Sequence, residues 1–142
     1  IEENIGKQRV IINTVNAMLG RIHLASRVWL FPADGLSLVT EGIDYYKSLI
    51  AVKKVAKPYF PIGFTKFGQK HVAAGIKTDD KIYLAVWNLG GDREFVIDTD
   101  CEIVEAKVGY PRNEKINCQI NEKSLKIEFS ENYQARIIEI KL

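Results

Sequence analysis

The chain is poor in cysteine and has no strong bias toward either charge. Its 142 residues include only Cys101 and Cys118, which lack C-x-x-C or metal-ligand spacing, and no N-x-Ser/Thr sequon occurs. Twenty Lys and Arg against eighteen Asp and Glu leave a net charge of +2, too balanced to favour a nucleic-acid or anionic-membrane partner. No apolar run approaches the about 18 residues that span a bilayer. We therefore expect no metal, cofactor or membrane segment, buried thiols rather than a disulfide, and a cytoplasmic location.

The composition that remains is that of a globular protein. Hydrophobic residues make up 46% and charged residues 27% of the chain, which excludes disorder and low-complexity tails. The length suits one ordinary domain, or a small domain with an appendage. The chain begins with Ile1 and continues with charged residues rather than a signal-peptide core. We therefore expect it to be a piece of a longer protein.

Residues 1–65 have mainly helical patterning. Apolar residues at helical spacing predict a first helix over 4–19, ended by Gly20; they are Ile5, Ile11, Ile12, Val15, Met18 and Leu19. Residues 21–26 alternate polar and apolar side chains, which predicts a short strand. A second helix is predicted over 35–55, with Asp34 as its N-cap. Its predicted apolar face consists of Leu36, Val39, Ile43, Tyr46 and Ile50.

Residues 66–142 change to the period of β-strands. Turn residues separate short segments rich in β-branched and aromatic side chains, which predicts seven or eight strands. Those segments are 70–77, 81–87, 94–97, 103–108, 116–120, 125–129 and 135–142. The pattern is typical of an antiparallel β-sandwich or small barrel.

The sequence therefore predicts an α+β fold of two parts. Residues 1–65, with net charge +3, form a helix-strand-helix segment, and residues 66–142, with net charge −1, form an antiparallel β-sandwich of seven or eight strands. A single strand of a parallel barrel is not stable alone, because its backbone amides stay unpaired and its two faces stay unburied. We therefore expect both helices to pack together and against the β-domain. Apolar surface left over would be covered by an oligomer partner.

A search for catalytic residues finds no convincing set. His23 and His71 belong to no metal-binding or hydrolase motif, so hydrogen-bonded structural roles are expected for both. The carboxylates of Asp34, Glu41 and Asp44 fall at a helix start and along a helix face, where nothing pairs them in one pocket. No nucleophile elbow or phosphate-binding loop occurs.

Aromatic residues crowd the first half and its junction with the second. They are Trp29, Tyr45, Tyr46, Tyr59, Phe60, Phe64 and Phe67. One hypothesis is a platform on which sugar rings stack; the other, favoured by the spread of positions, is an interface between the helices and the β-domain. Trp29 stands apart, because it follows the predicted strand, where α/β folds place ligand-contacting residues.

Four segments resemble a known enzyme family. Residues 16–27 (NAMLGRIHLASR) are similar to the closing segment of the catalytic barrel in bacterial α-galactosidases of glycoside hydrolase family 36. Residues 39–47 (VTEGIDYYK) resemble the last barrel helix of those enzymes, and 61–64 (PIGF) their linker. Residues 83–91 resemble the first hairpin of their C-terminal β-sandwich. The resemblance covers residues 7–98.

The resemblance implies a fold and an activity for a longer parent enzyme. The family cleaves terminal α-galactosides with retention, through two Asp residues on earlier strands of a (β/α)8 barrel, and no position here matches either motif. This chain is then a barrel remnant plus a β-sandwich, not catalytic alone, reaching the α-galactoside only through the parent. The end of the 21–26 strand would border the pocket, which makes Ser26, Arg27 and Trp29 the candidate substrate-binding residues.

Two other hypotheses stay open. A stand-alone carbohydrate-binding module would need an exposed aromatic platform on the sandwich, for which Tyr83, Trp87 and Tyr110 are the candidates. A protein-interaction domain would instead use the apolar face of the helices. The three hypotheses predict different exposures for these side chains.

Overall fold

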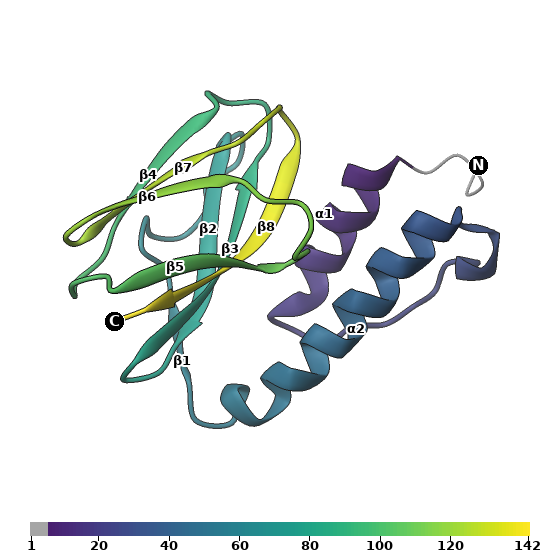
Figure 1. Ribbon diagram of the computed structural model, residues 1–142, viewed down its shortest axis with the longest axis horizontal. Coiled ribbons are helices and arrows are strands. Elements are labelled where there is room, and N and C mark those ends of the chain that lie inside the picture. Colours follow the sequence, from purple (N-terminus) through teal and green to yellow (C-terminus); the bar gives the residue numbers. More distant parts are fainter. Residues whose placement is uncertain (1–5) are drawn as a thin grey trace.

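The computed structural model describes residues 6–142 and has two helices beside two antiparallel sheets (Figure 1). Helix α1 spans Lys7–Met18 and α2 spans Ala33–Lys53, with a single turn of 3-10 helix, η1, at Val28–Leu30 between them. The chain is α+β, as predicted. The expected start of the first helix, at residues 4–5, lies outside the described residues.

Eight strands follow the helices. They are β1 (Lys57–Tyr59), β2 (His71–Lys77), β3 (Lys81–Asn88), β4 (Glu94–Asp98), β5 (Glu105–Tyr110), β6 (Asn117–Asn121), β7 (Ser124–Glu128) and β8 (Gln134–Lys141). The seven strands predicted after residue 66 are confirmed within two residues at each end. The first strand was not predicted, because its three residues include Pro58, but Lys57 pairs with Lys77 of β2.

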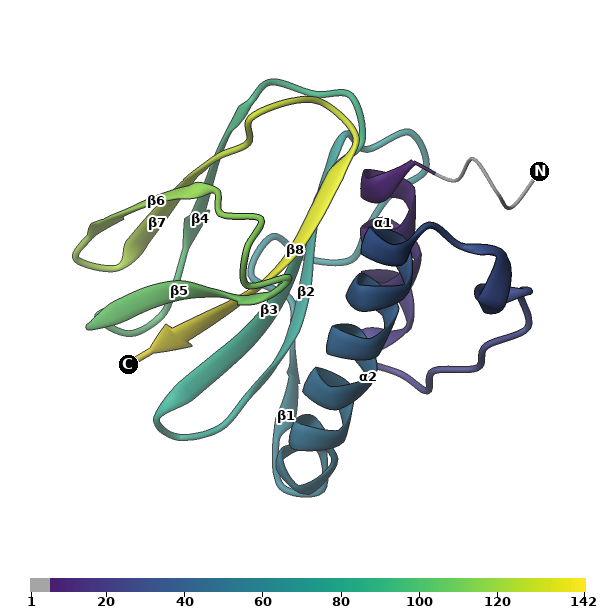
Figure 2. The ribbon, with the colours of Figure 1, turned by 45° about the vertical axis from the view of Figure 1, so that its right-hand side comes forward.

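The strands form a five-stranded sheet in the order β1-β2-β3-β8-β5 and a three-stranded sheet in the order β4-β7-β6. Buried side chains of both sheets share one apolar core; they include Leu84 and Ile138 of the larger sheet and Ile97 and Ile127 of the smaller. The two helices cover the opposite face of the larger sheet (Figure 2). The molecule therefore has three layers, with the larger sheet in the middle.

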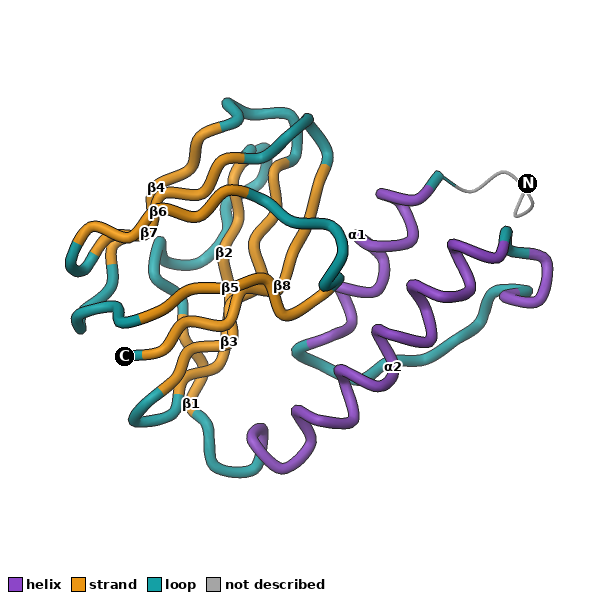
Figure 3. Tube along the Cα trace, viewed as in Figure 1, coloured by secondary structure: helices purple, strands orange, loops and turns teal. Residues whose placement is uncertain are grey.

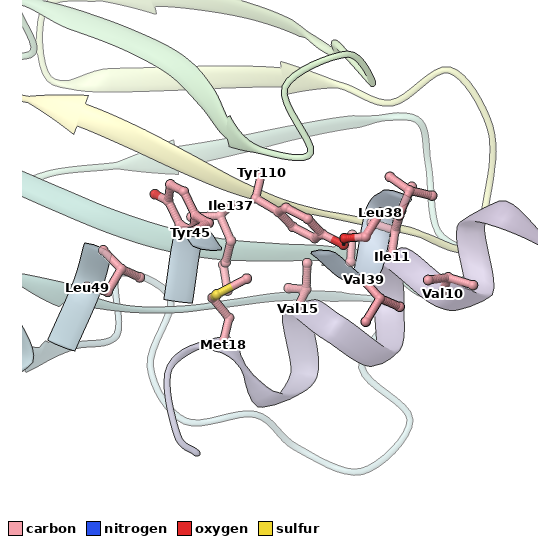
Figure 4. Close-up of a cluster of buried hydrophobic side chains, with 12 residues drawn as sticks. Val10, Ile11, Val15, Met18, Leu38, Val39, Tyr45, Leu49, Tyr110 and Ile137 are labelled. Carbon is pink, nitrogen blue, oxygen red and sulfur yellow. The ribbon is translucent and has the colours of Figure 1, made fainter. Parts of the chain in front are cut away.

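Alternation along β8 gives the middle layer its two apolar faces. Ala135 and Ile137 pack with the helices, whereas Ile138 and Ile140 pack with the smaller sheet. Val15 and Met18 of α1 reach the same core as Ile137 (Figure 4). The prediction that the helices pack together and on the β-domain is therefore confirmed.

The predicted strand over 21–26 is not formed. Residues 21–25 have no regular structure and Ser26 lies in a bend, within the long connection between the helices (Figure 3). A strand needs a neighbour that bonds to its backbone, and in the described part of the chain every sheet strand comes after α2 and the helices separate this connection from them. The alternating pattern alone does not supply that neighbour.

The predicted apolar face of α2 is only partly right. Val39 is buried, and Ile43 and Tyr46 pack partly buried against the helix–sheet core, but the rest of the buried face is shifted by about one position. Its buried residues are Gly35, Leu38, Val39, Gly42, Tyr45 and Leu49, whereas Leu36 is 43% and Ile50 45% exposed. Two glycines in this stripe hide it from a count of apolar side chains, and one of them, Gly42, lets the helix approach its neighbours closely. In addition, Asp34 lies inside the first turn and Pro32 occupies the N-cap position predicted for it.

Candidate functional site

The predicted substrate-binding residues lie in the connection between α1 and α2. Ser26 and Arg27 are exposed, and the carbonyl of Ser26 accepts a hydrogen bond from the backbone N–H of Val28 at 2.9 Å. The side chain of Trp29, on η1, is 72% exposed. Their role in sugar binding stays a prediction.

A shallow groove separates this connection from the two helices. Its volume is about 120 Å³, and apolar side chains dominate its lining, which also includes His23 and Ser26. Arg27 and Trp29 do not line it. Because ligand pockets for small molecules usually have at least about 300 Å³, this groove by itself is too small for a sugar ring with its neighbours.

The carboxylates of α2 do not converge on the groove. Glu41 accepts a 2.8 Å hydrogen bond from the backbone N–H of Arg112, and Asp34 accepts one from Gly35 at 2.9 Å. Asp44 is exposed and lies 3.8 Å from the ammonium of Lys47. Each of these three acids therefore has its own partner, and they do not form an acid and nucleophile pair.

His71 has the structural role expected for it. Its ring stacks on Phe95 with 4.7 Å between the centroids, and its Nε2 lies 2.7 Å from the backbone oxygen of Asp92. His23 is exposed at the groove. Among residues 6–142, no three His, Cys, Asp or Glu side chains gather as a metal site would require.

The three candidate platform aromatics lie beneath the helices. Tyr110 is fully buried and its hydroxyl donates a 3.0 Å hydrogen bond to the carbonyl of Leu38. Burial raises the pKa of Tyr110 to about 12. The indole N–H of Trp87 donates to Asn16 of α1 at 2.8 Å, and Tyr83 packs against the same helix–sheet core. Tyr110 therefore offers no stacking face to a sugar, and the partly buried Tyr83 and Trp87 belong to the interface between the helices and the sheet.

Other aromatic residues are exposed where an interface was predicted. Tyr45 is buried between helix and sheet as expected, but Phe60, Phe64 and Phe67 lie in the connection from β1 to β2 and face solvent. The rings of Phe60 and Phe64 contact each other with 4.8 Å between centroids. The interface hypothesis is therefore right for the helix and wrong for this connection.

A second, more open groove of about 550 Å³ lies beside β1 and includes Cys101 and Lys77. The ammonium of Lys77 binds both carboxylate oxygens of Asp100 at 2.7 and 2.8 Å and lies 3.7 Å from the Cys101 sulfur. The hydrogen bond to Asp100 raises the pKa of Lys77, so its amine stays protonated and is no nucleophile at neutral pH. Cys101 and Cys118 are free thiols that are partly rather than fully buried.

One contact between the two helices could not be predicted from neighbouring residues in the sequence. The ammonium of Lys53, near the end of α2, donates to the carbonyls of Met18 at 2.6 Å and Gly20 at 3.0 Å. It thereby satisfies carbonyls that α1 leaves open at its C-terminus. Burial lowers the pKa of Lys53. Its partners are more than thirty positions away, beyond the reach of a pattern search.

Comparisons with known protein families and with curated proteins identify no relative of the chain. No protein-family model matches the sequence, and no curated protein is similar to it. Within residues 6–142, neither helix combines the length and the apolar character that crossing a bilayer demands.

Proposed function

We propose that this chain is the C-terminal portion of an α-galactosidase-like glycosidase. Its helices are the last part of a (β/α)8 catalytic barrel, and its two sheets are a β-sandwich that buttresses the barrel. The parent enzyme would hydrolyse terminal α-galactosides with retention, and this chain would carry no catalytic residue.

The observation that carries the proposal is a second apolar face on the helices. One face packs on the larger sheet, yet Leu36 and Ile50 of α2 remain 43% and 45% exposed, and Leu24 of the connection between the helices is 53% exposed. We infer that these side chains belong to one apolar patch, because an exposed apolar patch on a monomer marks a contact with something else. The outer side of a barrel remnant has this property, because its neighbouring strands and helices would cover it.

The connection after α1 supports the same interpretation. Residues 21–26 alternate as a strand does, and they lie within the segment that resembles the end of the barrel. They lack a strand neighbour among residues 6–142. In a complete barrel such a segment would have a strand on each side, and Ser26 would lie at the pocket end.

A stand-alone carbohydrate-binding module has less support. Its platform would need Tyr83, Trp87 and Tyr110 on an exposed face, but Tyr110 is buried and Trp87 is bonded to α1. Without these rings the sheets present no aromatic stacking surface of the kind that the hypothesis required.

The test compares two proteins. The product of the whole reading frame that encodes these residues should cleave p-nitrophenyl α-galactoside and release the α-anomer first, seen by proton NMR. The chain of residues 1–142 alone should show no turnover. p-Nitrophenyl β-galactoside and α-glucoside are matched control substrates. Turnover by the isolated chain, or no α-galactosidase activity in the whole product, overturns the proposal.

A further inference from the structure

Two stretches of the chain carry opposite charge. Residues 54–77, the basic segment, contain five lysines and no acidic residue. Residues 92–105, the acidic segment, contain six acidic residues and one basic residue, Arg93. Their net charges of +5 and −5 are hidden in the balanced total of the whole chain.

The two segments lie side by side. At one end the ammonium of Lys77 is 2.7 Å from Asp100. At the other end His71 stacks on Phe95 and its Nε2 lies 2.7 Å from the backbone oxygen of Asp92. His71 and Lys77 are the two ends of β2, so these contacts place β2 of the basic segment alongside residues 92–100 of the acidic segment. Basic and acidic side chains therefore share this part of the surface.

Most of these charges have no ion-pair partner among residues 6–142. No ion pair among the described residues includes four of the five lysines or four of the six acids; these are Lys54, Lys57, Lys66, Lys70, Asp92, Asp98, Glu102 and Glu105. Lysines and carboxylates of this surface can therefore form ion pairs with a partner.

Apolar side chains are exposed in both halves. Phe64 is 79% exposed and Phe67 fully exposed in the basic segment, next to the partly exposed Phe60. Val96 and Val104 are exposed in the acidic segment. An aromatic side chain buries about 150 to 250 Å², so these three rings alone would supply roughly half of the about 800 Å² that each partner buries in a stable interface.

We propose that this surface joins two copies of the chain in a dimer with two-fold symmetry. A two-fold axis near the Lys77–Asp100 pair places the basic segment of each copy against the acidic segment of the other, so every contact occurs twice. The exposed phenylalanines then lie within the interface and the charges at its rim. A nucleic acid or an anionic membrane fits the surface less well, because six carboxylates beside the lysines would repel it.

The first measurement is the mass of the isolated chain by sedimentation equilibrium. At about 50 mM salt we expect about twice the 16.1 kDa of one chain. Raising the salt to about 500 mM should weaken dimerisation roughly tenfold, because rim charges are screened. A monomer in both buffers overturns the proposal, as does binding to anionic vesicles or to an oligonucleotide by a chain that stays monomeric.

The second measurement exchanges the charges. Lys66→Glu with Lys70→Glu should be monomeric, since acidic segments then oppose each other, and Asp92→Lys with Glu102→Lys should be monomeric for the converse reason. Mixed in equal amounts, the two variants should restore the dimer, because both contacts regain opposite charges. Lys47→Glu with Lys115→Glu makes the same charge change at exposed positions outside both segments and should leave the dimer intact.

Circular dichroism establishes that each variant is folded. A mixture that stays monomeric, or a dimer that persists in the single-segment variants, overturns the proposed interface. The result is independent of the glycosidase assay, because dimerisation is read without substrate.

Discussion

The hydroxyl of Tyr45 donates a 2.9 Å hydrogen bond to the carboxylate of Glu139 and so joins α2 to β8 across 94 positions of sequence. A Cβ on Gly109 would lie 2.5 Å from the same hydroxyl, so the glycine makes room for the bond. Burial and the nearby Glu139 carboxylate both raise the pKa of Tyr45. The helix layer is thereby fixed on the sheet by a polar contact as well as by apolar packing.

Replacing Tyr45 by Phe should lower the free energy of unfolding by about 1 to 2 kcal/mol, because the bond to a charged acceptor is lost while the ring is kept. Urea denaturation followed by circular dichroism measures the change. Tyr46→Phe is the matched control, since the neighbouring Tyr46 is only partly buried and no hydrogen bond of its hydroxyl joins it to the described residues. Equal losses in the two variants would contradict the role of the Glu139 contact.

Alkaline pH should destabilise the protein through its buried tyrosines. The pKa of Tyr110 is about 12 in the folded chain, and that of Tyr45 is raised as well, whereas an unfolded tyrosine ionises near its ordinary value of 10.0. Above that value the unfolded chain releases phenolic protons that the folded chain retains, so stability is present below pH 10 and falls as pH rises. Each tyrosine contributes about 1.4 kcal/mol per pH unit.

Between about pH 9 and pH 11 the two tyrosines together should lower the free energy of unfolding by roughly 2 to 3 kcal/mol. Chemical denaturation at each pH gives the slope. In Tyr45→Phe the loss should be about half as large. A variant that follows the same pH dependence as the unaltered chain would show that Tyr45 does not contribute.

Gly42 should tolerate no side chain, although alanine is the better helix former. A Cβ there would collide with the Cγ2 of Thr14 and lie 3.3 Å from the ring of Tyr110. Thr14 has little freedom to move, because its hydroxyl donates to the carbonyl of Val10 at 2.9 Å. Gly42→Ala should therefore destabilise the chain by about 1 to 3 kcal/mol.

Gly35, in the same helix, is the matched control. A Cβ there meets Phe31 at an ordinary 3.6 Å. Gly35→Ala should stabilise the chain by about 0.5 to 1 kcal/mol through helix propensity. Thermal or urea unfolding of both variants checks the opposite signs, and the same sign in both would contradict the close approach at Gly42.

Glu114 should matter because it compensates a buried charge. Arg136 is 1% exposed, its Nε donates to the Glu114 carbonyl at 2.7 Å, and its Nη2 lies 3.8 Å from the Glu114 carboxylate. Lys7 of α1 pairs with the same carboxylate. Burial lowers the pKa of Arg136, and the Glu114 charge opposes that effect.

Glu114→Gln should therefore cost about 2 kcal/mol, since a buried guanidinium would lose its only counter-ion among the described ion pairs. Glu122→Gln, at an exposed turn, should change stability by less than about 0.5 kcal/mol. Urea denaturation measures both variants. A neutral effect of Glu114→Gln would mean that the backbone carbonyls of Glu114 and Ala135, together with the side-chain oxygen of Gln8, suffice for Arg136.

The strands could be predicted closely because each is short, alternates with period two and ends at a turn. The strand at residues 57–59 escaped prediction because Pro58 argues against it and only its pairing with β2 defines it. The candidate residues Ser26, Arg27 and Trp29 could be named from the resemblance, but nothing local predicted the irregular connection that holds them. A strand at 21–26 depends on neighbours, and a pattern within one segment does not reveal them.

The sequence by itself determined where both helices and the seven strands after residue 66 lie and that both helices have an apolar side to bury, because spacing and turn residues are local properties. Only the tertiary structure decided which side of α2 is buried. Gly42 contributes no hydrophobicity to a pattern, yet it lets α2 lie against Thr14 and Tyr110. The tertiary structure also decided that the basic and acidic segments lie together, because the overall charge balance does not show which charged residues are neighbours. Both outcomes depend on contacts between residues far apart in the chain.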